Sequence, residues 1–267
     1  MYRAAVITLF LLSFGVSGCA TLPNGKPDPR DRFERFNRSV YKFNTVVDHA
    51  VLRPVARTYV KLPQPIRTSI NNFFTNFTYP TTVANDLFQG KFTDGVTDSA
   101  RIVVNTTLGL GGLFDPATRM GLERHTQDFG LTLGRWGVHS GPFLELPFLG
   151  PSDVRDAIGL IPDYAINYVI SDQLINNNWA SGGMFVVSMV DKRSQLLDLD
   201  KVLDSAYDPY AFTRNAYLQR RNYLLHGDQS PEEEFPDAQL DDDKGSPKGD
   251  APKSAAPPGE SVQSPKN

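Results

Sequence analysis

The chain has 267 residues, enough for one large or two small domains, and its formal net charge is −3. Residues 228–267 hold ten acidic and four basic groups, a net charge of −6, which leaves +3 for the remainder. That balance is too weak for a nucleic-acid-binding surface, and no basic stripe interleaved with aromatics is present. The single cysteine, Cys19, excludes an intramolecular disulfide bond, and the four histidines are too scattered for a metal site, so no metal or other cofactor is expected.

The N-terminal segment is typical of a targeting sequence. Arg3 is followed by an apolar run from Ala4 to Val16, too short for a membrane-spanning helix. The run ends in Val-Ser-Gly-Cys19, which resembles the bacterial lipobox, in which cleavage precedes a lipid-modified cysteine. The alternative is a chance cysteine after an ordinary signal. We predict a signal peptide at 1–18 and lipidation at Cys19. By the same resemblance, Ala20 directs the protein to the outer membrane, anchored by two or three acyl chains.

Residues 19–30 contain three prolines and a glycine and read as a tether. After Asp31, large apolar residues recur at three- and four-residue steps and predict an amphipathic helix: Phe33, Phe36, Val40, Phe43 and Val47. Pro54 then precedes a second short helical stretch that reaches Leu62.

Pro65 suits the first position of another helix, and an apolar stripe follows it at Ile66, Ile70, Phe73, Phe74 and Phe77. Pro80 and Gly90 predict a separate short piece between them, and a further helix is expected from Thr93 to Leu108. The glycines at 109, 111 and 112 follow a helix and no lysine follows them. They indicate a turn and not a phosphate-binding loop.

The segment from Asp128 to Asp156 contains five glycines and three prolines among eleven large apolar residues. Backbone broken this often cannot satisfy its polar groups within one helix. It is consistent either with a packed core loop or with a wall beside a wet cavity.

Beyond this segment, Ser152 is the expected N-cap of a helix from Asp153, which Gly159 and Pro162 should interrupt. Irregular structure is expected over 163–183, then helices over 185–206 and 209–226 with Gly227 as the stop signal. Residues 228–267 are acidic and proline-rich and are predicted to be disordered.

The predicted helices are generally shorter than the ~20 residues that cross a bilayer. Their broad phenylalanine-rich faces suit either a core or helices lying flat in one leaflet, and periodicity alone favours the core. The fold class is therefore predicted to be all-α.

Several short motifs occur in a fixed order. They are Phe36-Asn37-Arg38, Phe43-Asn44, Asn72-Phe73-Phe74, Asn76-Phe77, Asn85-Asp86, Gln89-Gly90-Lys91, Asn105-Thr106-Thr107-Leu108-Gly109, Gly112-Leu113-Phe114-Asp115, Asp128-Phe129-Gly130, Thr132-Leu133-Gly134, Trp136-Gly137-Val138, Gly141-Pro142-Phe143, Leu146-Pro147, Gly150-Pro151-Ser152, Arg155-Asp156 and Asp208-Pro209-Tyr210. From about Asp28 to Gly227 the chain resembles the MlaA/VacJ family of outer-membrane lipoproteins.

The resemblance implies a ring of short amphipathic helices and glycine-rich loops around a channel, lying in the inner leaflet beside trimeric porins. It implies that phospholipid is removed from the outer leaflet, passes through the channel and is handed to the soluble periplasmic lipid-carrier protein of the Mla system. The domain layout is then a signal peptide (1–18), a lipidated tether (19–30), a helical MlaA-like domain (31–227) and a tail (228–267).

The candidate channel or gate residues are Phe36, Asn37, Arg38, Phe43, Asn44, Gly130, Gly134, Gly137, Gly141, Arg155 and Asp156. The glycines either flex as a gate or allow close backbone approach. Arg155 and Asp156 either line a polar track or form an ion pair at a helix start, and the ion pair is favoured. Asn37, Arg38 and Asn44 either contact headgroups or brace neighbouring helices.

Two other functions are considered. A lipid hydrolase would use Ser140 and His139 with Asp128 or Asp153, but the G-x-S-x-G elbow and its strand–helix context are missing, so we expect no enzyme. A docking scaffold without transport predicts no path through the molecule.

Overall fold

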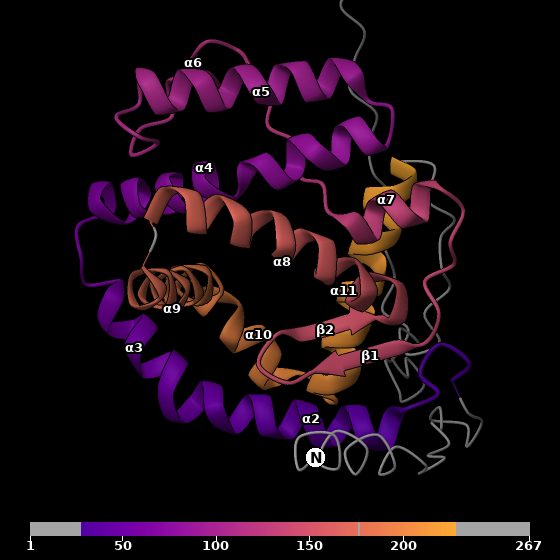
Figure 1. Ribbon diagram of the computed structural model, residues 1–267. Coiled ribbons are helices and arrows are strands. Elements are labelled where there is room, and N and C mark those ends of the chain that lie inside the picture. The colour runs from indigo at the N-terminus through magenta and orange to yellow at the C-terminus, as the bar shows by residue number, and fades with distance from the viewer. Residues whose placement is uncertain (1–27, 176, 228–267) are drawn as a thin grey trace, which may run out of the picture. The chain divides into compact units, whose positions relative to one another are not determined.

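The computed structural model describes residues 28–175 and 177–227 (Figure 1). In chain order the elements are α2 (Glu34–Val47), the π-helical turn η1 (Asp48–Leu52), α3 (Arg53–Tyr59), α4 (Gln64–Phe88), α5 (Phe92–Thr107), α6 (Pro116–Arg119), α7 (Phe129–Arg135), β1 (Phe143–Leu146), β2 (Gly150–Asp153), α8 (Val154–Ile175), α9 (Asn178–Gln195), the 3-10 turn η2 (Leu197–Leu199), α10 (Asp200–Ser205) and α11 (Pro209–His226). The described part is mostly helical, which confirms the predicted fold class. The predictions for Cys19, the signal peptide and the tail lie outside the described residues.

Three helices begin and end close to their predicted limits. These are α2, α5 and α11, and α11 stops at Gly227, whose φ of +64° suits glycine. The glycines after α5 form a turn, as predicted. Local periodicity and caps were therefore sufficient for these helices.

The interruptions predicted at Pro80, Gly159 and Pro162 are wrong, whereas the boundary predicted at Gly90 is confirmed. α4 runs through Pro80 as one helix of 25 residues, and α8 runs through Gly159 and Pro162 for 22 residues. Gly159 is required by packing, because a Cβ there would lie 2.5 Å from the backbone nitrogen of Gly130. The irregular segment expected over 163–183 is the end of α8 and the start of α9. Although α4 and α8 exceed 20 residues, no helix in the described part combines the length and apolarity needed to span a membrane.

The broken segment before α8 contains an antiparallel hairpin that the sequence analysis missed. β1 pairs with β2 in a register that places Phe143 opposite Asp153 and Leu146 opposite Gly150. The cap of α8 is Asp153 and not Ser152, because the Asp153 Oδ1 accepts the backbone N–H of Asp156 at 2.7 Å. The single helix expected over 185–206 is divided into α9, η2 and α10.

The described residues bury more polar than apolar side chains. Eight hydrophobic residues are buried, against twenty-one polar or charged ones. On α2 the buried residues are Glu34, Asn37 and Val40, whereas Phe33, Phe36 and Phe43 are exposed. The core expected behind the phenylalanine face of this helix is thus wrong, and its polar face packs inward.

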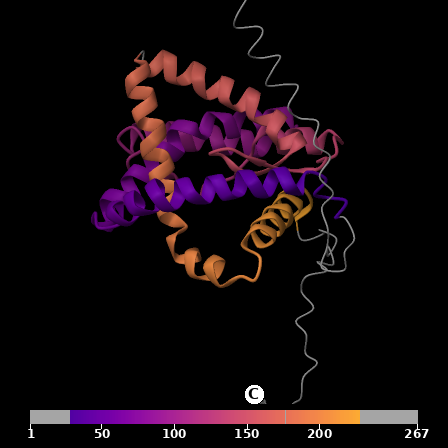
Figure 2. The ribbon, with the colours of Figure 1, turned by 90° about the horizontal axis from the view of Figure 1, so that it is seen from below.

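Within the described part, the packed neighbours form a closed circuit. It leads from α2 to the hairpin, then to α11, α7, α8, α9 and α3, and returns to α2 through η1. α4 and α5 pack side by side along one edge (Figure 1). Figure 2 shows the sharp bend between α8 and α9, and the short α10 that leads into α11.

Candidate functional site

Two asparagines of α2 hold the edge of the hairpin. The Asn37 amide nitrogen donates to the Phe143 carbonyl at 3.0 Å, and its oxygen accepts the Glu145 N–H at 2.9 Å. Two helical turns further on, on the same face, the Asn44 amide nitrogen donates to the Leu146 carbonyl at 2.9 Å, and its oxygen accepts the Phe148 N–H at 2.9 Å. These side chains replace a third strand at the open edge of β1. Both asparagines thus brace the hairpin, where the sequence analysis considered bracing of neighbouring helices.

Glu145 is the buried acid of this junction. Its side chain is 2% exposed, one carboxyl oxygen accepts from Asn44 at 3.0 Å, and the other is buried without a hydrogen-bond partner. Burial raises the pKa of Glu145 to about 7, although the Asn44 hydrogen bond lowers it. The α2–hairpin junction therefore contains an acid that changes charge near neutral pH.

The other candidates on α2 face different neighbours. Arg38 forms ion pairs with Glu34 at 2.6 Å and with Asp208, the N-cap of α11, at 2.5 Å. Its guanidinium lies 4.4 Å from the centre of the Tyr210 ring. Phe43 packs edge-to-face on Phe148 at the hairpin turn, with ring centres 5.1 Å apart. Phe36 is exposed on the same helix.

Next to the hairpin, α7, α8 and α11 meet at a cluster of charged residues. Both nitrogens at the tip of Arg221 donate to Asp128, at 2.5 and 2.9 Å. Arg221 also pairs with Asp156, which accepts the Tyr217 hydroxyl at 2.5 Å and the Arg155 Nε–H at 2.9 Å. The ion pair favoured for Arg155 and Asp156 forms, and it is buried.

The electrostatics of this cluster follow from its partners. Burial raises the pKa of Asp128, but the hydrogen bonds and charge of Arg221 outweigh burial and hold it below its ordinary value. Asp153 pairs with Arg155 only at 3.5 Å and its Oδ2 has no hydrogen bond, so burial and the charge of Asp156 outweigh the arginines and raise the pKa of Asp153 to about 6. The positive and negative charges of the cluster are therefore closely balanced, and its hydrogen bonds hold α7, α8 and α11 in a rigid arrangement.

The candidate glycines have two different roles. A Cβ on Gly130 would lie 2.3 Å from the Asp156 carboxyl oxygen, and one on Gly134 would lie 2.8 Å from Arg155. These two positions allow close packing of α7. Gly137 and Gly141 instead have φ of +90° and +72°, values that residues other than glycine rarely adopt.

Sequence reasoning missed the contribution of α11. Four polar side chains on one of its faces reach the buried acids: Tyr210, Arg214, Tyr217 and Arg221. Arg214 pairs with Asp31 at 3.1 Å and with Asp28 at 3.2 Å. The steps of four, three and four residues place them on a single stripe, a signal that was present in the sequence.

The acids considered for a hydrolytic triad are engaged elsewhere. Asp128 binds Arg221 and caps α7 through the Leu131 N–H at 2.8 Å. Asp153 caps α8, and His139 is exposed. Neither acid has a geometry in which it orients His139 toward Ser140.

Comparison with known proteins identifies the fold. Residues 29–224 match the family described as MlaA lipoprotein. The chain is 37% identical over 230 residues to the intermembrane phospholipid transport system lipoprotein MlaA of Shigella flexneri, covering 83% of this chain and 89% of the relative. It is 36% identical over 231 residues to the protein of that name from Escherichia coli (strain K12), with the same two coverages.

A solved structure is also similar. It is described as "Structural basis for maintenance of bacterial outer membrane lipid asymmetry" and aligns with a TM-score of 0.62 at 36% identity, covering 73% of this chain and 98% of the other. The chain belongs to the MlaA lipoprotein family.

Proposed function

We propose that this chain is an outer-membrane lipoprotein that removes misplaced phospholipid from the outer leaflet and so maintains lipid asymmetry. Two relatives are named for an intermembrane phospholipid transport system, and the similar structure concerns outer-membrane lipid asymmetry. Identity above one third over most of both chains supports the same activity here.

The observation that carries the proposal is the inverted distribution of apolar residues. Among the described residues 38 large hydrophobic side chains are exposed, whereas eight hydrophobic residues are buried. On α8 and α9, Ile161 is 71%, Leu174 is 72% and Trp179 is 91% exposed. In water, exposed apolar surface costs roughly 25 cal/mol per Å². Acyl chains around these helices remove that cost, which supports helices lying along a leaflet.

The closed circuit of elements supports a ring around an amphipathic channel. A phospholipid has a charged head and apolar tails, so its passage requires a polar track inside an apolar exterior. Contacts between elements of the circuit include polar ones, such as the ion pairs of Arg193 with Asp48 at 2.6 Å and with Asp200 at 2.7 Å. In this proposal the hydrogen bonds and ion pairs of Asn37, Asn44, Arg155 and Asp156 stabilise the wall of the channel. Phe36, Arg38 and Phe43 contact either lipid or neighbouring side chains.

Movement of the hairpin is the proposed gate. Gly137 and Gly141 flank the segment that joins α7 to β1, and their positive φ values place flexible backbone at both of its ends. Gly130 and Gly134 stay packed and keep α7 fixed against α8. The gate thus has hinges beside a rigid support.

The anchor and the partners complete the proposal. Lipidated Cys19 tethers the helical domain of residues 31–227 to the outer membrane, on its periplasmic face. A trimeric porin holds the domain in place, and a soluble periplasmic carrier of the Mla system receives the lipid. The tail, residues 228–267, serves no part of the lipid path.

A disulfide across the gate tests transport against the scaffold alternative. Phe43→Cys with Phe148→Cys replaces two rings in contact, and Cys19 is committed to lipid, so oxidation links only this pair. In cells lacking their own MlaA, the reduced variant is expected to keep the outer leaflet free of phospholipid, measured by its accessibility to an added phospholipase. The oxidised variant is expected to fail, and each single-cysteine variant is the control. Equal lipid levels in all of them would support the scaffold.

A further inference from the structure

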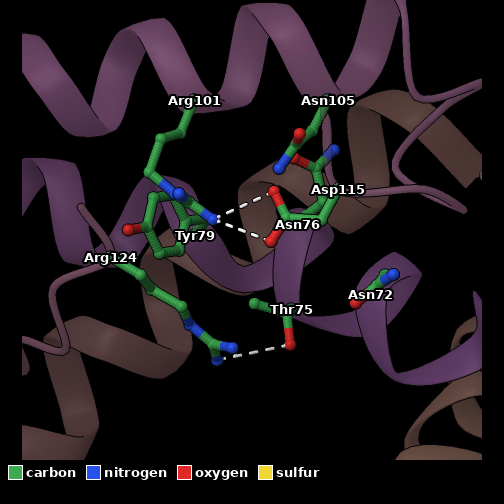
Figure 3. Close-up of a pocket in the computed structure, with 8 residues that line it drawn as sticks. All are labelled: Asn72, Thr75, Asn76, Tyr79, Arg101, Asn105, Asp115 and Arg124. Carbon is green, nitrogen blue, oxygen red and sulfur yellow. Dashed lines mark hydrogen bonds and ion pairs between the residues drawn. The ribbon is translucent and has the colours of Figure 1, made fainter. Parts of the chain in front are cut away.

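A polar pocket lies between α4, α5 and the segment around α6 (Figure 3). α4 contributes Asn72, Thr75 and Asn76, α5 contributes Arg101, and Asp115 and Arg124 come from the segments that flank α6. No residue of the hairpin or of the ionic cluster below it lines this pocket. It is therefore separate from the site already described.

The pocket is built by a polar stripe and a close backbone approach. Asn72, Thr75, Asn76 and Tyr79 are spaced by three, one and three residues and share one face of α4. Gly112 has φ of +91°, and a Cβ there would lie 2.6 Å from the Asn76 Cβ. Only glycine allows the turn after α5 to fold this closely onto the stripe.

The charge of Arg101 is already balanced. Its NH2 group donates to both Asp115 oxygens at 3.0 and 3.1 Å, and its NH1 group donates to the Leu122 carbonyl. Burial raises the pKa of Asp115, but hydrogen bonds from Thr118 and the charge of Arg101 outweigh burial and keep it below its ordinary value. The Arg101 Nε–H is buried and has no hydrogen-bond partner, so the pocket also contains an unused donor.

The positive charge of Arg124 is not paired with an acidic side chain of the described residues. Its guanidinium contacts the Thr75 hydroxyl at 3.5 Å, and within the described residues no carboxylate pairs with it. The neighbouring Glu123 is 87% exposed, and its carboxylate lies 4.0 Å from His125 instead. The pocket as a whole therefore attracts an anion.

Neutral donors surround this charge. The Asn76 amide donates to the Thr106 hydroxyl at 3.0 Å, and the Asn72 amide donates to the Leu113 carbonyl at 3.4 Å. Each amide nitrogen has two N–H groups, so each retains a second donor. An oxyanion with several oxygens matches this arrangement of donors.

We propose that the pocket binds a phosphate group, with Arg124 as its charged partner and Asn72, Asn76 and Thr75 as neutral donors. A guanidinium forms two parallel hydrogen bonds to phosphate, which a lysine cannot do. Leu113 and Phe114, which directly precede Asp115, are exposed. Apolar chains beside the phosphate favour a phospholipid headgroup over free phosphate, and this assignment rests on the proposed function.

The test measures binding to the full lipidated chain in phosphate-free maltoside micelles by native mass spectrometry. The probes are dihexanoyl phosphatidylglycerol, dihexanoylglycerol, which lacks the phosphate, and inorganic phosphate. Arg124→Gln is expected to weaken phosphatidylglycerol binding by about tenfold, which corresponds to about 1.4 kcal/mol. Arg119→Gln, an exposed arginine on α6 outside the pocket, is the matched control and should bind as the wild type does.

The outcomes separate this inference from the proposed function. Equal binding of both lipids, or unchanged binding by Arg124→Gln, overturns the phosphate site while lipid transport stands. Inorganic phosphate bound more tightly than the lipid, and lost in Arg124→Gln, supports the site and overturns its assignment to lipid. A wild type that binds no lipid at all contradicts the proposed function itself. Arg124→Gln should melt at the wild-type temperature, because its side chain is exposed.

Discussion

Glu145→Gln is the sharpest perturbation of the α2–hairpin junction. The substitution keeps the shape of the side chain and the oxygen that accepts from Asn44, and removes the carboxyl group that titrates. Since Glu145 is 2% exposed and its second oxygen has no partner, its ionised form is poorly solvated in the folded protein. The variant should therefore change how stability depends on pH.

The magnitude follows from the two pKa values. The carboxyl group has an ordinary pKa of 4.5, and burial raises it to about 7 in the fold. Well below pH 4.5 the group is protonated in both the folded and the unfolded state, so it does not lower the free energy of unfolding. As the pH rises, the unfolded chain ionises first, so this part of the stability is lost through pH 7. A difference of about 2.5 pH units corresponds to about 3 kcal/mol at ~1.36 kcal/mol per unit.

The assay is thermal unfolding by circular dichroism from pH 4.5 to 8.5. At the acidic end the melting temperatures of Glu145→Gln and the wild type differ by a constant that reflects the new amide. At pH 8.5 the variant should have gained about 6 to 12 °C relative to that constant. Glu123→Gln, at a position 87% exposed, should show no such gain. A Glu145→Gln difference that stays flat across this range would refute the reasoning.

Four further predictions concern other parts of the chain. Burial and the neighbouring Asp98 carboxylate raise the pKa of Asp86 to about 7, so the melting temperature of Asp86→Asn should rise relative to the wild type between pH 3.8 and pH 8. Gly130→Ala places a Cβ 2.3 Å from a carboxyl oxygen and should cost about 1–3 kcal/mol in thermal unfolding. Gly182→Ala, where a Cβ meets nothing within 4 Å, should instead stabilise α9 by about 0.5–1 kcal/mol. Cys19→Ser should leave an unprocessed precursor of higher mass, and normal membrane retention of that variant would contradict the anchor.

Sequence periodicity predicted α2, α5 and α11 well because their limits depend on local caps and helical spacing. The hairpin was missed because its strands are four residues long and β1 depends on Asn37 and Asn44, more than a hundred positions before Phe148. Pro80 was predicted to be a helix boundary because proline weakens a helix locally. The prediction is wrong because packing along α4 keeps the helix continuous.

Of the candidate residues, the sequence identified the segments and not the roles. Asn37 and Asn44 were weighed between headgroup contact and bracing of neighbouring helices, and only the tertiary structure shows that they brace the hairpin. Arg155 and Asp156 were favoured as an ion pair, but Tyr217 and Arg221, which complete the cluster, come from α11. The residues of such a cluster are far apart in the sequence, so their sequence positions do not predict that they are close in space.

By itself the sequence determined the helical class, the family and the turn after α5, because these depend on short motifs and near-neighbour spacing. Only the tertiary structure decided which face of each helix is buried. Periodicity shows that a helix has an apolar face, but it does not say whether water or lipid surrounds the protein. Here the phenylalanine face of α2 is exposed and its polar face is buried, because the charged partners of that face lie on the hairpin and on α11.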